Sequence, residues 1–475
     1  MKIRTRFAPS PTGYMHVGNL RSAIFGYLVC KKENGDFILR IEDTDQTRTV
    51  PGATEFIYNT LKLCGLEIDE GPLNGGDYGP YIQSERLHIY DKYAKELVEK
   101  GGAYHCFCGE DRLEELRKEA ELKKVPFLYD GHCRNLSKEE INEKIKNGEK
   151  FVIRQKIPKE GTTEYEDVVY GHMSFQNNLL EDQVLIKSDR YPTYNFANVI
   201  DDHLMDITHV IRGNEYLTAT PKYNLLYDAF GFEKPTYIHL PWVVDENHKK
   251  LSKRHGAASF MDLYEAGYVP QGVVNYLTLL GWSPETTQEI FSLEELIQAF
   301  DPHRINKSPA VFDIKKLNWV NAHYIKKLSL DELYVITYPH LVREYGEIDE
   351  EWSKHLISIY QNHIHYGKEI VDVTKIFFTK EYNISDEAEE FLNEDKETVK
   401  KVLNQFETDI NDLSDWSVEK ITELIKEVGK KVEVKGKMLF MTIRIAVSGE
   451  MHGPELPDTI YLLGKEKVLE NLKKI

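Results

Sequence analysis

The order of the first segments is the feature that constrains the fold most. Alternating apolar residues over 3–7 predict a strand, apolar residues over 17–28 recur at helical spacing, and the run FILRI at 37–41 predicts a second strand. Strand, helix and strand joined by short loops indicate a parallel βαβ unit. Parallel sheets bind ligands outside the carboxyl ends of their strands, so the loops that follow these strands are expected to carry the chemistry.

The loop after the first predicted strand suits close approach to a ligand. It reads APSPTGYMHVGN at residues 8–19, with two prolines and two glycines. The small residues let a phosphate come near the backbone, and the start of the next helix offers unpaired N–H groups and the positive end of its dipole. His16 stands at that helix start, where a histidine either donates to a phosphate oxygen or serves as a cap.

Composition limits the class of protein. The net charge of −18 at pH 7 argues against a nonspecific DNA-binding protein, although the basic run HKKLSKRH at 248–255 leaves room for an RNA partner. The five cysteines are too few, and odd in number, for a disulfide framework, and no apolar run is long enough to cross a bilayer. We expect a cytoplasmic protein with no membrane partner.

The 475 residues exceed what one core accommodates, and the pattern of segments predicts how they divide. Parallel-sheet character over 1–82 returns over 190–248, which predicts one split, Rossmann-like α/β sheet. Mixed helices and strands over 83–189 predict an inserted α/β domain. A basic loop region covers 249–325, and 326–475 is predicted to be helical.

Finer predictions concern single elements. A strand is predicted at 168–171, within the inserted domain, and single helices are predicted at 328–344 and 384–406. Pro339 is expected to kink or break the helix at 328–344, because proline removes a backbone donor and clashes with the preceding turn.

Charged residues of both signs follow the predicted strands. They are Arg6 near the end of the first strand, with the polar Ser10 in the loop after it, Glu42, Asp43 and Asp45 after FILRI, Arg212 and Glu215 after ITHVI, and the basic loop KKLSKRHG at 249–256. Because the carboxyl ends of parallel strands meet at one edge of a sheet, we expect these groups to surround one crevice. Such a crevice suits a zwitterionic, anionic small molecule beside a polyphosphate, and Lys253 suits the charge that develops as pyrophosphate leaves.

In these motifs the chain resembles the bacterial glutamyl-tRNA synthetases, which are class I aminoacyl-tRNA synthetases. FAPSPTGYMHVGN resembles their HIGH-region signature and KLSKR their KMSKS loop; FILRIEDTDQTR, GPYIQSER, YPTYNFANVIDDHLM and THVIRGNEY also match the family pattern. The resemblance continues through GWSPE and VFDIKKLNWVN into the last third of the chain. The departures are Asn19 in place of the last HIGH histidine, Leu251 and Arg254 in KLSKR, and Tyr216 where a tryptophan often occurs.

The resemblance implies an activity for each region. The inserted domain at 83–189 would bind the tRNA acceptor end, 249–325 would hold the KLSKR loop and a stem-contact region, and 326–475 would bind the anticodon. The implied enzyme is a glutamate–tRNA ligase: it activates L-glutamate with ATP to glutamyl-adenylate and transfers it to the 3′ end of tRNA(Glu). ATP with Mg²⁺ is the expected cofactor, although no carboxylate cage for the metal is evident in the sequence, and a monomer is expected.

The resemblance also implies roles for single residues. Arg6, Tyr194 and Arg212 would recognise the side-chain carboxylate of glutamate, because a guanidinium fork makes charge-assisted, bidentate hydrogen bonds. The remaining roles are these: Ala8 and Ser10 at the amino-acid backbone, Glu42 at its ammonium group, Asn198 completing that pocket, His16 and Gly18 along ATP, Glu215 at the ribose, and Lys250, Ser252 and Lys253 at the phosphates. His16 and Lys253 would be the catalytic pair.

Three cysteines in the inserted domain leave two interpretations open. Cys106 and Cys108 are followed after 24 residues by Cys133, a spacing with which some family members bind zinc. The family's further ligand falls on Asn135, which is a poor one, and Tyr129 and His132 are the substitutes nearby. Structural zinc takes four ligands, so the sequence permits either a zinc site or three reduced thiols.

The anticodon-binding region raises a question of tRNA choice. Family members that accept only tRNA(Glu) use an arginine there to reject the glutamine anticodon, whereas YQNHIHYGKEI at 360–370 has none and Gln361 occupies the place. This gives the hypothesis that tRNA(Gln) is also charged with glutamate. The alternative is that an arginine is supplied from elsewhere in the chain, or that the alignment is displaced by a helical turn.

Four other functions were weighed against this one. A glutaminyl-tRNA synthetase shares the front half but has a β-barrel C-terminal part, and a tRNA-modifying paralogue lacks the helical third. A nucleotidylyltransferase with a similar site is typically much shorter. A non-catalytic RNA-binding relative would lose His16 or Lys253, and both are present.

Overall fold

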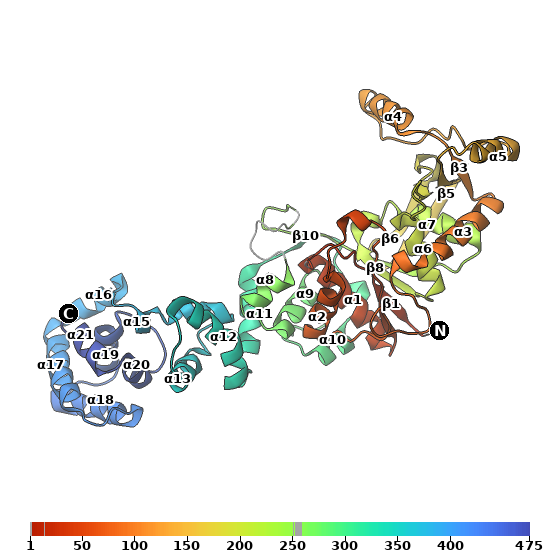
Figure 1. Ribbon diagram of the computed structural model, residues 1–475. Helices are drawn as coiled ribbons and strands as arrows, with labels where there is room; N and C mark the ends of the chain where they lie inside the picture. Colours follow the sequence, from red (N-terminus) through yellow and green to blue (C-terminus); the bar gives the residue numbers. More distant parts are fainter. Residues whose placement is uncertain (1, 14, 250, 252–258) are drawn as a thin grey trace. The chain divides into compact units, whose positions relative to one another are not determined.

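The computed structural model describes residues 2–13, 15–249, 251 and 259–475 of the chain (Figure 1). The chain divides into two compact units, the first formed by Met1–Leu263 with Val273–Ile314 and the second by Tyr264–Gly272 with Lys315–Ile475. No helix in the described ranges is long and apolar enough to cross a membrane.

A six-stranded sheet organises the first unit, in the order β2-β1-β8-β9-β5-β6. The strands are β1 (Arg4–Phe7), β2 (Asp36–Leu39), β5 (Thr162–Asp167), β6 (Gly171–Gln176), β8 (His209–Gly213) and β9 (Thr236–Leu240). All neighbours pair in parallel except β5 and β6, which form an antiparallel hairpin. The predicted α/β class, with a sheet split along the chain, is confirmed, but three separated parts of the chain contribute its strands instead of the expected two: β1 with β2, β5 with β6, and β8 with β9.

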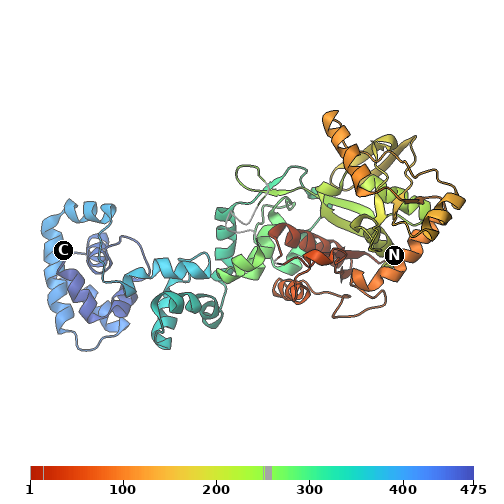
Figure 2. The same cartoon turned by 45° about the horizontal axis from the view of Figure 1, so that its top comes forward.

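The first unit contains these helices. They are α1 (Val17–Lys32), α2 (Ala53–Leu63), α3 (Leu87–Glu99), α4 (Glu110–Leu122), α5 (Lys138–Lys146), α6 (Tyr194–Leu204), α7 (Thr220–Phe230) and α10 (Leu293–Ala299), with α8 (Phe260–Glu265) and α9 (Pro270–Leu279) spanning the changes between units. In Figures 1 and 2, α1 lies beside β1 and β8. Its segment from Ala23 to Cys30 is buried on every side, which is why its apolar residues exceed a single stripe.

The hairpin β5–β6 belongs to the large sheet, although its residues fall within the segment predicted as an inserted domain. The edge pairing joins Asp167 of β5 to Tyr237 of β9. The predicted strand at 168–171 is wrong, because Val168–Tyr170 form the hairpin turn: the backbone N–H groups of Val169 and Tyr170 both donate to the Asp167 carboxylate. An aspartate that accepts bonds from the residues just after it favours a turn over an extended strand.

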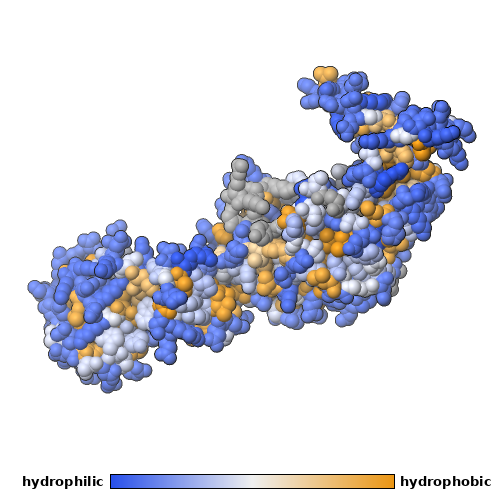
Figure 3. All heavy atoms as spheres, in the orientation of Figure 1, coloured by the Kyte–Doolittle hydropathy of each residue, from blue (hydrophilic) through white to orange (hydrophobic). Residues whose placement is uncertain are grey.

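A small antiparallel sheet accounts for the rest of the segment 83–189. Its order is β3-β4-β7, formed by β3 (Ala103–Cys106), β4 (Val152–Gln155) and β7 (Val184–Ile186). The helices α4 and α5 between β3 and β4 have no buried residues, and Figure 3 shows their surface to be mainly hydrophilic. A further two-stranded sheet pairs β10 (Val243–Val244) with β11 (Ala310–Val311).

The second unit is helical in its described residues. It contains α11 (Ile314–Ile325), α12 (Leu330–Tyr345), α13 (Glu350–Tyr360), α14 (Ile370–Val373), α15 (Lys375–Phe378), α16 (Asp386–Glu394), α17 (Lys396–Asp412), α18 (Val418–Val432), α19 (Lys437–Ser448), α20 (Leu456–Leu463) and α21 (Lys465–Leu472). One apolar core joins α17 to α21 around Phe406 and Ile443, and another joins α12 to α14 around Leu333 and Leu356.

Two helix predictions for this unit need correction. Of the kink or break expected at Pro339, the break does not occur, since α12 runs from Leu330 through Pro339 to Tyr345. The single helix expected at 384–406 is two helices, because Asp395 leaves the helical conformation (φ −145°, ψ 81°) and caps α17 by accepting from the backbone N–H of Thr398. Aspartate is favoured at N-caps for this reason.

Candidate active site

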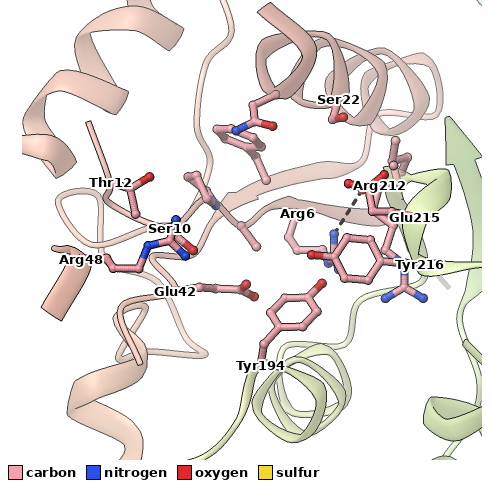
Figure 4. A pocket seen from close by; sticks show the side chains of 16 residues that line it. Arg6, Ser10, Thr12, Ser22, Glu42, Arg48, Tyr194, Arg212, Glu215 and Tyr216 are labelled. Atoms are coloured by element: carbon pink, nitrogen blue, oxygen red, sulfur yellow. Dashed lines mark hydrogen bonds between the residues drawn. The ribbon is translucent and has the colours of Figure 1, made fainter. Parts of the chain in front are cut away.

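A cavity of about 320 Å³ opens at the carboxyl ends of β1 and β8 (Figure 4). Its walls come from the loop after β1, the segment after β2, the start of α6 and the segment after β8. The lining residues are Arg6, Phe7, Ala8, Pro9, Ser10, Thr12, Asn19, Ser22, Glu42, Arg48, Tyr194, Ile211, Arg212, Gly213, Glu215 and Tyr216. This is the edge at which parallel sheets bind ligands.

A buried ion-pair network forms one side of this cavity. The Arg6 guanidinium makes a two-pronged pair with Asp202, with Nε 3.0 Å from Oδ1 and Nη2 3.3 Å from Oδ2, and it also donates to the Ile211 carbonyl. Arg40, with no exposed surface, pairs with Glu42 at 3.1 Å and with Asp202 at 2.8 Å. The pairs orient Arg6 and Glu42, and leave Arg6 with two N–H groups that these bonds do not use.

The charges of the network balance one another. Arg86 pairs with Asp201 at 2.8 Å, and Arg40 lies 3.7 Å from Asp201, so three guanidinium groups meet three carboxylates. Burial opposes the charged form of Asp202, but Arg6 and Arg40 outweigh it and hold its pKa below the ordinary value. Buried ions are tolerated when each is paired and hydrogen-bonded in this way.

Glu42 is the one carboxylate of this network that lines the cavity. Its side chain points into the cavity in Figure 4, facing Tyr194. Burial raises the pKa of Glu42 to about 7, against the opposing effect of Arg40 and Arg6. A ligand cation beside Glu42 would favour its ionised form.

Arg212 is held by neutral groups instead. Its Nε donates to the Nε2 of His239 at 3.1 Å and its Nη2 donates to the Thr220 hydroxyl at 2.8 Å. The guanidinium also lies 4.8 Å from the ring centre of Tyr223 and 5.2 Å from that of Tyr216. Among the described residues no carboxylate lies within ion-pair distance of Arg212, although only 6% of the residue is exposed. A buried cation of this kind favours an anionic ligand.

Two tyrosines pack side by side at the cavity, Tyr194 at the start of α6 and Tyr216 after β8, with ring centres 5.2 Å apart. Asn198 lies one turn further along α6 and is buried, with its amide donating to the Tyr194 carbonyl at 2.6 Å. Asn198 is not among the residues that line the cavity, so in this structure its amide braces the helix start that presents Tyr194.

Short backbone bonds shape the loop after β1. The N–H of Glu42 donates to the Pro9 carbonyl at 3.0 Å, and the N–H of Val50 donates to the Pro11 carbonyl at 2.9 Å. These bonds join the loop to the segment after β2 and leave Ser10 exposed at the cavity. Ala8 and Ser10, named from the sequence, therefore line the same space as Glu42.

His16 is the N-cap of α1, and its Nδ1 accepts the N–H of Gly18 at 3.1 Å. The ring proton is therefore on Nε2, which lies 3.3 Å from the carbonyl oxygen of Leu251. His16 also pairs with Ser259 in an isolated β-bridge. The described residues on either side of 252–258 thus both contact His16, which does not itself line the cavity.

Glu215 lines the cavity near the end of β8, and its carboxylate accepts the indole N–H of Trp242 at 3.2 Å. A Cβ at Gly213 would come within 2.1 Å of that carboxylate, so glycine is required for Glu215 to keep its position. The expected phosphate residues Lys250, Ser252 and Lys253 lie outside the described residues.

The structure thus brings seven of the expected glutamate and ATP residues to one cavity: Arg6, Ala8, Ser10, Glu42, Tyr194, Arg212 and Glu215. His16, Gly18 and Asn198 contact neighbours of the cavity without lining it. Sequence reasoning missed Arg48, which lines the cavity, and the groups behind it: Arg40, Asp202 and His239. Arg48 follows the acidic run EDTD, a signal that was available; the others are indistinguishable from ordinary polar residues until the chain is folded.

The three cysteines of the segment 83–189 converge away from this cavity. Cys106, Cys108 and Cys133 place their sulfur atoms within 4.8 Å of one another, and the Tyr129 hydroxyl lies 3.3 Å from both Cys106 Sγ and Cys108 Sγ. His132 and Asn135 are exposed.

A Rossmann-like sheet with its cavity at the strand ends, followed by a helical unit, has the architecture of a class I tRNA synthetase. The family of tRNA synthetases class I (E and Q), catalytic domain, matches residues 2–319, and the anticodon binding domain family matches residues 332–475. The glutamate–tRNA ligase of Clostridium novyi (strain NT) is 50% identical over 99% of this chain and 97% of that protein, and that of Clostridium tetani is also 50% identical over the same shares.

Solved structures that resemble this chain are also glutamate–tRNA ligases. A glutamate tRNA ligase from Elizabethkingia meningosepticum in complex with its amino acid is 34% identical, with a TM-score of 0.86 over 100% of this chain and 99% of that one. The glutamate-tRNA synthetase of Elizabethkingia anophelis gives a TM-score of 0.89 at the same identity and shares. The chain belongs to the glutamate–tRNA ligase family. Its substrates are accordingly glutamate, ATP and tRNA.

Proposed function

We propose that L-glutamate lies in the cavity with its ammonium group at Glu42 and its side-chain carboxylate between Arg6 and Arg212. One observation carries this orientation: Arg212 is a buried cation whose described partners are neutral, and it lines the same cavity as the carboxylate of Glu42. Glutamate is a zwitterion with a second carboxylate: its side-chain carboxylate supplies an anion for Arg212, and its ammonium group supplies a cation for Glu42. Glutamine would leave Arg212 without a counter-ion, which gives the preference for glutamate.

Activation then proceeds at the α-carboxylate, which points toward the loop after β1. An oxygen of this carboxylate attacks the α-phosphorus of ATP, the new C–O–P bond forms, and the bond to pyrophosphate breaks. A carboxylate needs no base, so positioning and charge stabilisation supply the rate. The Nε2–H of His16 donates to a phosphate oxygen, and Lys253 neutralises the leaving pyrophosphate. The 2′-hydroxyl of the terminal ribose of tRNA then attacks the activated carbonyl and releases AMP.

Mg²⁺ enters with the phosphates of ATP in this proposal. Glu42 and Glu215, the carboxylates that line the cavity, already contact Arg40 and Trp242. Mg²⁺ commonly keeps several waters and takes its remaining ligands from substrate phosphates, so the protein need not supply a cage.

The substitution Arg212→Gln tests the glutamate orientation. It should raise the KM for glutamate by about tenfold or more, the loss expected for one charge-assisted interaction, and should narrow the discrimination against glutamine. Arg117→Gln, on the exposed surface of α4, is the matched control and should leave the KM for glutamate unchanged. Equal KM values for the wild type and Arg212→Gln would overturn the orientation.

We further propose that Cys106, Cys108, Cys133 and Tyr129 hold a structural zinc ion. The Tyr129 hydroxyl lies 3.3 Å from the sulfur atoms of Cys106 and Cys108, Cys108 Sγ lies 3.7 Å from Cys133 Sγ, and all three sulfur atoms lie within 4.8 Å of one another. These distances are near the spacing of roughly 3.8 Å around a tetrahedral zinc with bonds of about 2.3 Å. Tyr129 is favoured over His132 as fourth ligand because its hydroxyl faces two of the sulfur atoms while His132 is exposed. The zinc would fix the chain after β3 to the loop around Cys133.

Zinc content measured by inductively coupled plasma mass spectrometry tests this site. We expect about one zinc per wild-type chain, none in Cys133→Ser, and weakened retention against a chelator in Tyr129→Phe but not in His132→Ala. A wild-type protein that holds no zinc when prepared with zinc present would refute the site. Loss of zinc only in His132→Ala would refute Tyr129 as the ligand.

We also propose that the enzyme charges tRNA(Gln) with glutamate as well as tRNA(Glu). In the segment 360–370, which has no arginine, the amide of Gln361 donates to the carbonyls of Ile325 and Leu328 at 2.9 and 2.8 Å. The arginines after residue 315 are Arg343 and Arg444, and Arg444 donates to the Pro454 carbonyl. We propose in addition that the enzyme acts as a monomer.

Charging both purified tRNAs with radiolabelled glutamate tests this choice. Product with both is expected, and product with tRNA(Glu) alone would overturn the proposal. If tRNA(Glu) alone is charged, Arg343→Gln tests whether Arg343 rejects the glutamine anticodon, because Arg343 is exposed and is the arginine of this region that remains after Arg444.

A further inference from the structure

Behind the cavity, Asp167, His239 and Arg212 form a buried chain of hydrogen bonds. The Nδ1 of His239 lies 2.6 Å from Asp167 Oδ2, and the Nε of Arg212 donates to His239 Nε2 at 3.1 Å. Asp167 and His239 are 3% and 0% exposed. Asp167 is the last residue of β5, which lies between β9 and β6 in the sheet, whereas Arg212 lies in β8. The chain therefore links the hairpin β5–β6 to a residue that lines the amino-acid cavity.

The bond to Asp167 decides which nitrogen of His239 carries the proton. A carboxylate can only accept, so Nδ1 must donate to it, and Nε2 is then the unprotonated nitrogen that accepts from Arg212. Burial lowers the pKa of His239 to about 4, although the hydrogen bond to Asp167 works in the opposite direction, so the ring is neutral at pH 7. The Thr220 hydroxyl accepts Arg212 Nη2 and donates to the Tyr216 carbonyl at 2.8 Å.

Neutral acceptors hold the Arg212 guanidinium without cancelling its charge. Two of its five N–H groups are fixed by His239 and Thr220, and the others are left for a ligand. Arg6, in contrast, has Asp202 directly on its guanidinium. A carboxylate in the position of His239 would orient Arg212 equally well but would compete with the substrate carboxylate for it.

We propose that Asp167 and His239 are positioning residues for glutamate specificity: Asp167 fixes the tautomer of His239, which presents Arg212 to the substrate side chain without pairing a carboxylate directly to the guanidinium. This inference rests on the proposed role of Arg212 in binding glutamate. It assigns a part in amino-acid selection to a residue of the segment 83–189, through contact with β9 rather than with any ligand.

A purely structural role for Asp167 is the competing explanation, and the two carboxylate oxygens separate the two roles. Oδ1 accepts the turn N–H groups of Val169 and Tyr170, whereas Oδ2 accepts His239 Nδ1 and, at 3.2 Å, the His239 backbone N–H. In Asp167→Asn, an amide that still caps the turn presents N–H groups to His239. The His239 proton must then move from Nδ1 to Nε2. There it meets the Nε–H of Arg212, so two donors face each other and the hydrogen bond between His239 and Arg212 is lost.

The test is a double-mutant cycle on the full-length enzyme. Asp167→Asn should raise the KM for glutamate at least tenfold and lower the ratio of kcat/KM for glutamate over glutamine, with the KM for ATP unchanged. His239→Gln supplies an amide oxygen to Arg212 and has no tautomer, so it should keep most of the discrimination, while His239→Leu should lose it. In the His239→Gln background, Asp167→Asn should have less than a third of its effect on the KM for glutamate.

The outcomes separate this inference from the proposed function. If Arg212→Gln leaves the discrimination intact, the proposed role of Arg212 fails. If Arg212→Gln abolishes the discrimination while Asp167→Asn and His239→Leu preserve it, only the positioning role fails. Equal effects of Asp167→Asn on the KM for glutamate in the wild-type and His239→Gln backgrounds also overturn the inference. If Asp167→Asn does not fold, the comparison of His239→Leu with His239→Gln decides, and equal discrimination by these two variants overturns the inference.

Discussion

Arg6 and Asp202 form a two-pronged ion pair beside the cavity at the ends of β1 and β8, with Nε and Nη2 of the guanidinium on the two carboxylate oxygens. The pair joins β1 to α6, which are 196 residues apart in the chain. The pair fixes the plane of the Arg6 guanidinium before any ligand binds. The two N–H groups of Arg6 that make none of these bonds therefore already have fixed directions. Preorganisation of this kind lowers the cost of binding a planar carboxylate.

The variant Asp202→Asn tests this pair. It should lower the free energy of unfolding by about 3–5 kcal/mol at pH 7, because Arg6 and Arg40 then share a buried site with one carboxylate fewer. Asp202 has a pKa below its ordinary value, so its contribution is present above about pH 4 and is lost as the pH falls through the folded-state pKa. Urea denaturation at several pH values measures the difference, which should shrink in acid; a difference independent of pH would contradict this account.

Glutamate binding should weaken on the acid side of neutrality. The pKa of Glu42 is about 7, so the carboxylate that we propose receives the substrate ammonium group is largely protonated at pH 6 and largely ionised at pH 8. The KM for glutamate should therefore be about tenfold higher at pH 6 than at pH 8. Glu42→Gln should raise the KM at pH 8 and remove this dependence. The same slope in wild type and variant would assign the titration to another group.

His16 combines two roles that substitution can separate. In His16→Asn the N-cap is retained, because asparagine caps helices well, but the Nε2–H donor is lost. We expect kcat for aminoacylation to fall about 10²- to 10³-fold with little change in melting temperature. His16→Ala should lose activity to the same extent and also stability, by about 1 kcal/mol. Full activity in the asparagine variant would show that His16 acts only as a cap.

The helical unit should lose stability when its core is opened. Phe406 has no exposed surface in the core shared by α17 to α21, so Phe406→Ala should cost about 3–5 kcal/mol. Thermal unfolding followed by circular dichroism should show the transition of this unit displaced downward. Glu407→Ala, the next residue along α17 and exposed, is the control and should stay within about 0.5 kcal/mol of the wild type.

Sequence reasoning placed the elements that carry a strong local pattern. The alternating residues at 3–7 correspond to β1, and the apolar residues at helical spacing over 17–28 correspond to α1. The two patterns differ because side chains alternate faces along a strand but return to one face every 3.6 residues, on average, along a helix. Arg6 and Arg212 near the carboxyl ends of β1 and β8, and Glu42 after β2, line one cavity because parallel strands end at the same edge. These inferences need only the order of segments.

Other features depend on contacts that no local pattern records. The strand β5, TTEYED, buries Thr163, Tyr165 and Asp167 on one face, so its inward side is mostly polar and gives no hydrophobic alternation. Its inward aspartate is satisfied by His239, 72 residues further on. Asp202 and Arg40 are equally hidden, since each is a plain charged residue until the fold supplies its partner.

The course of the chain through the two sheets has a consequence for building hybrids of this enzyme with its relatives. β3 and β4 belong to the small sheet, β5 and β6 to the large one, β7 to the small one again, and β8 and β9 to the large one. Neither sheet is encoded by one uninterrupted stretch. In a chimaera that exchanges residues 83–189 as a block, the residue at position 167 and its partner His239 would come from two different parent proteins. Breakpoints that leave β5 and β6 in place would keep both partners, and the cavity they support, from one parent. On the ribosome, that pocket cannot assemble until β9 has emerged.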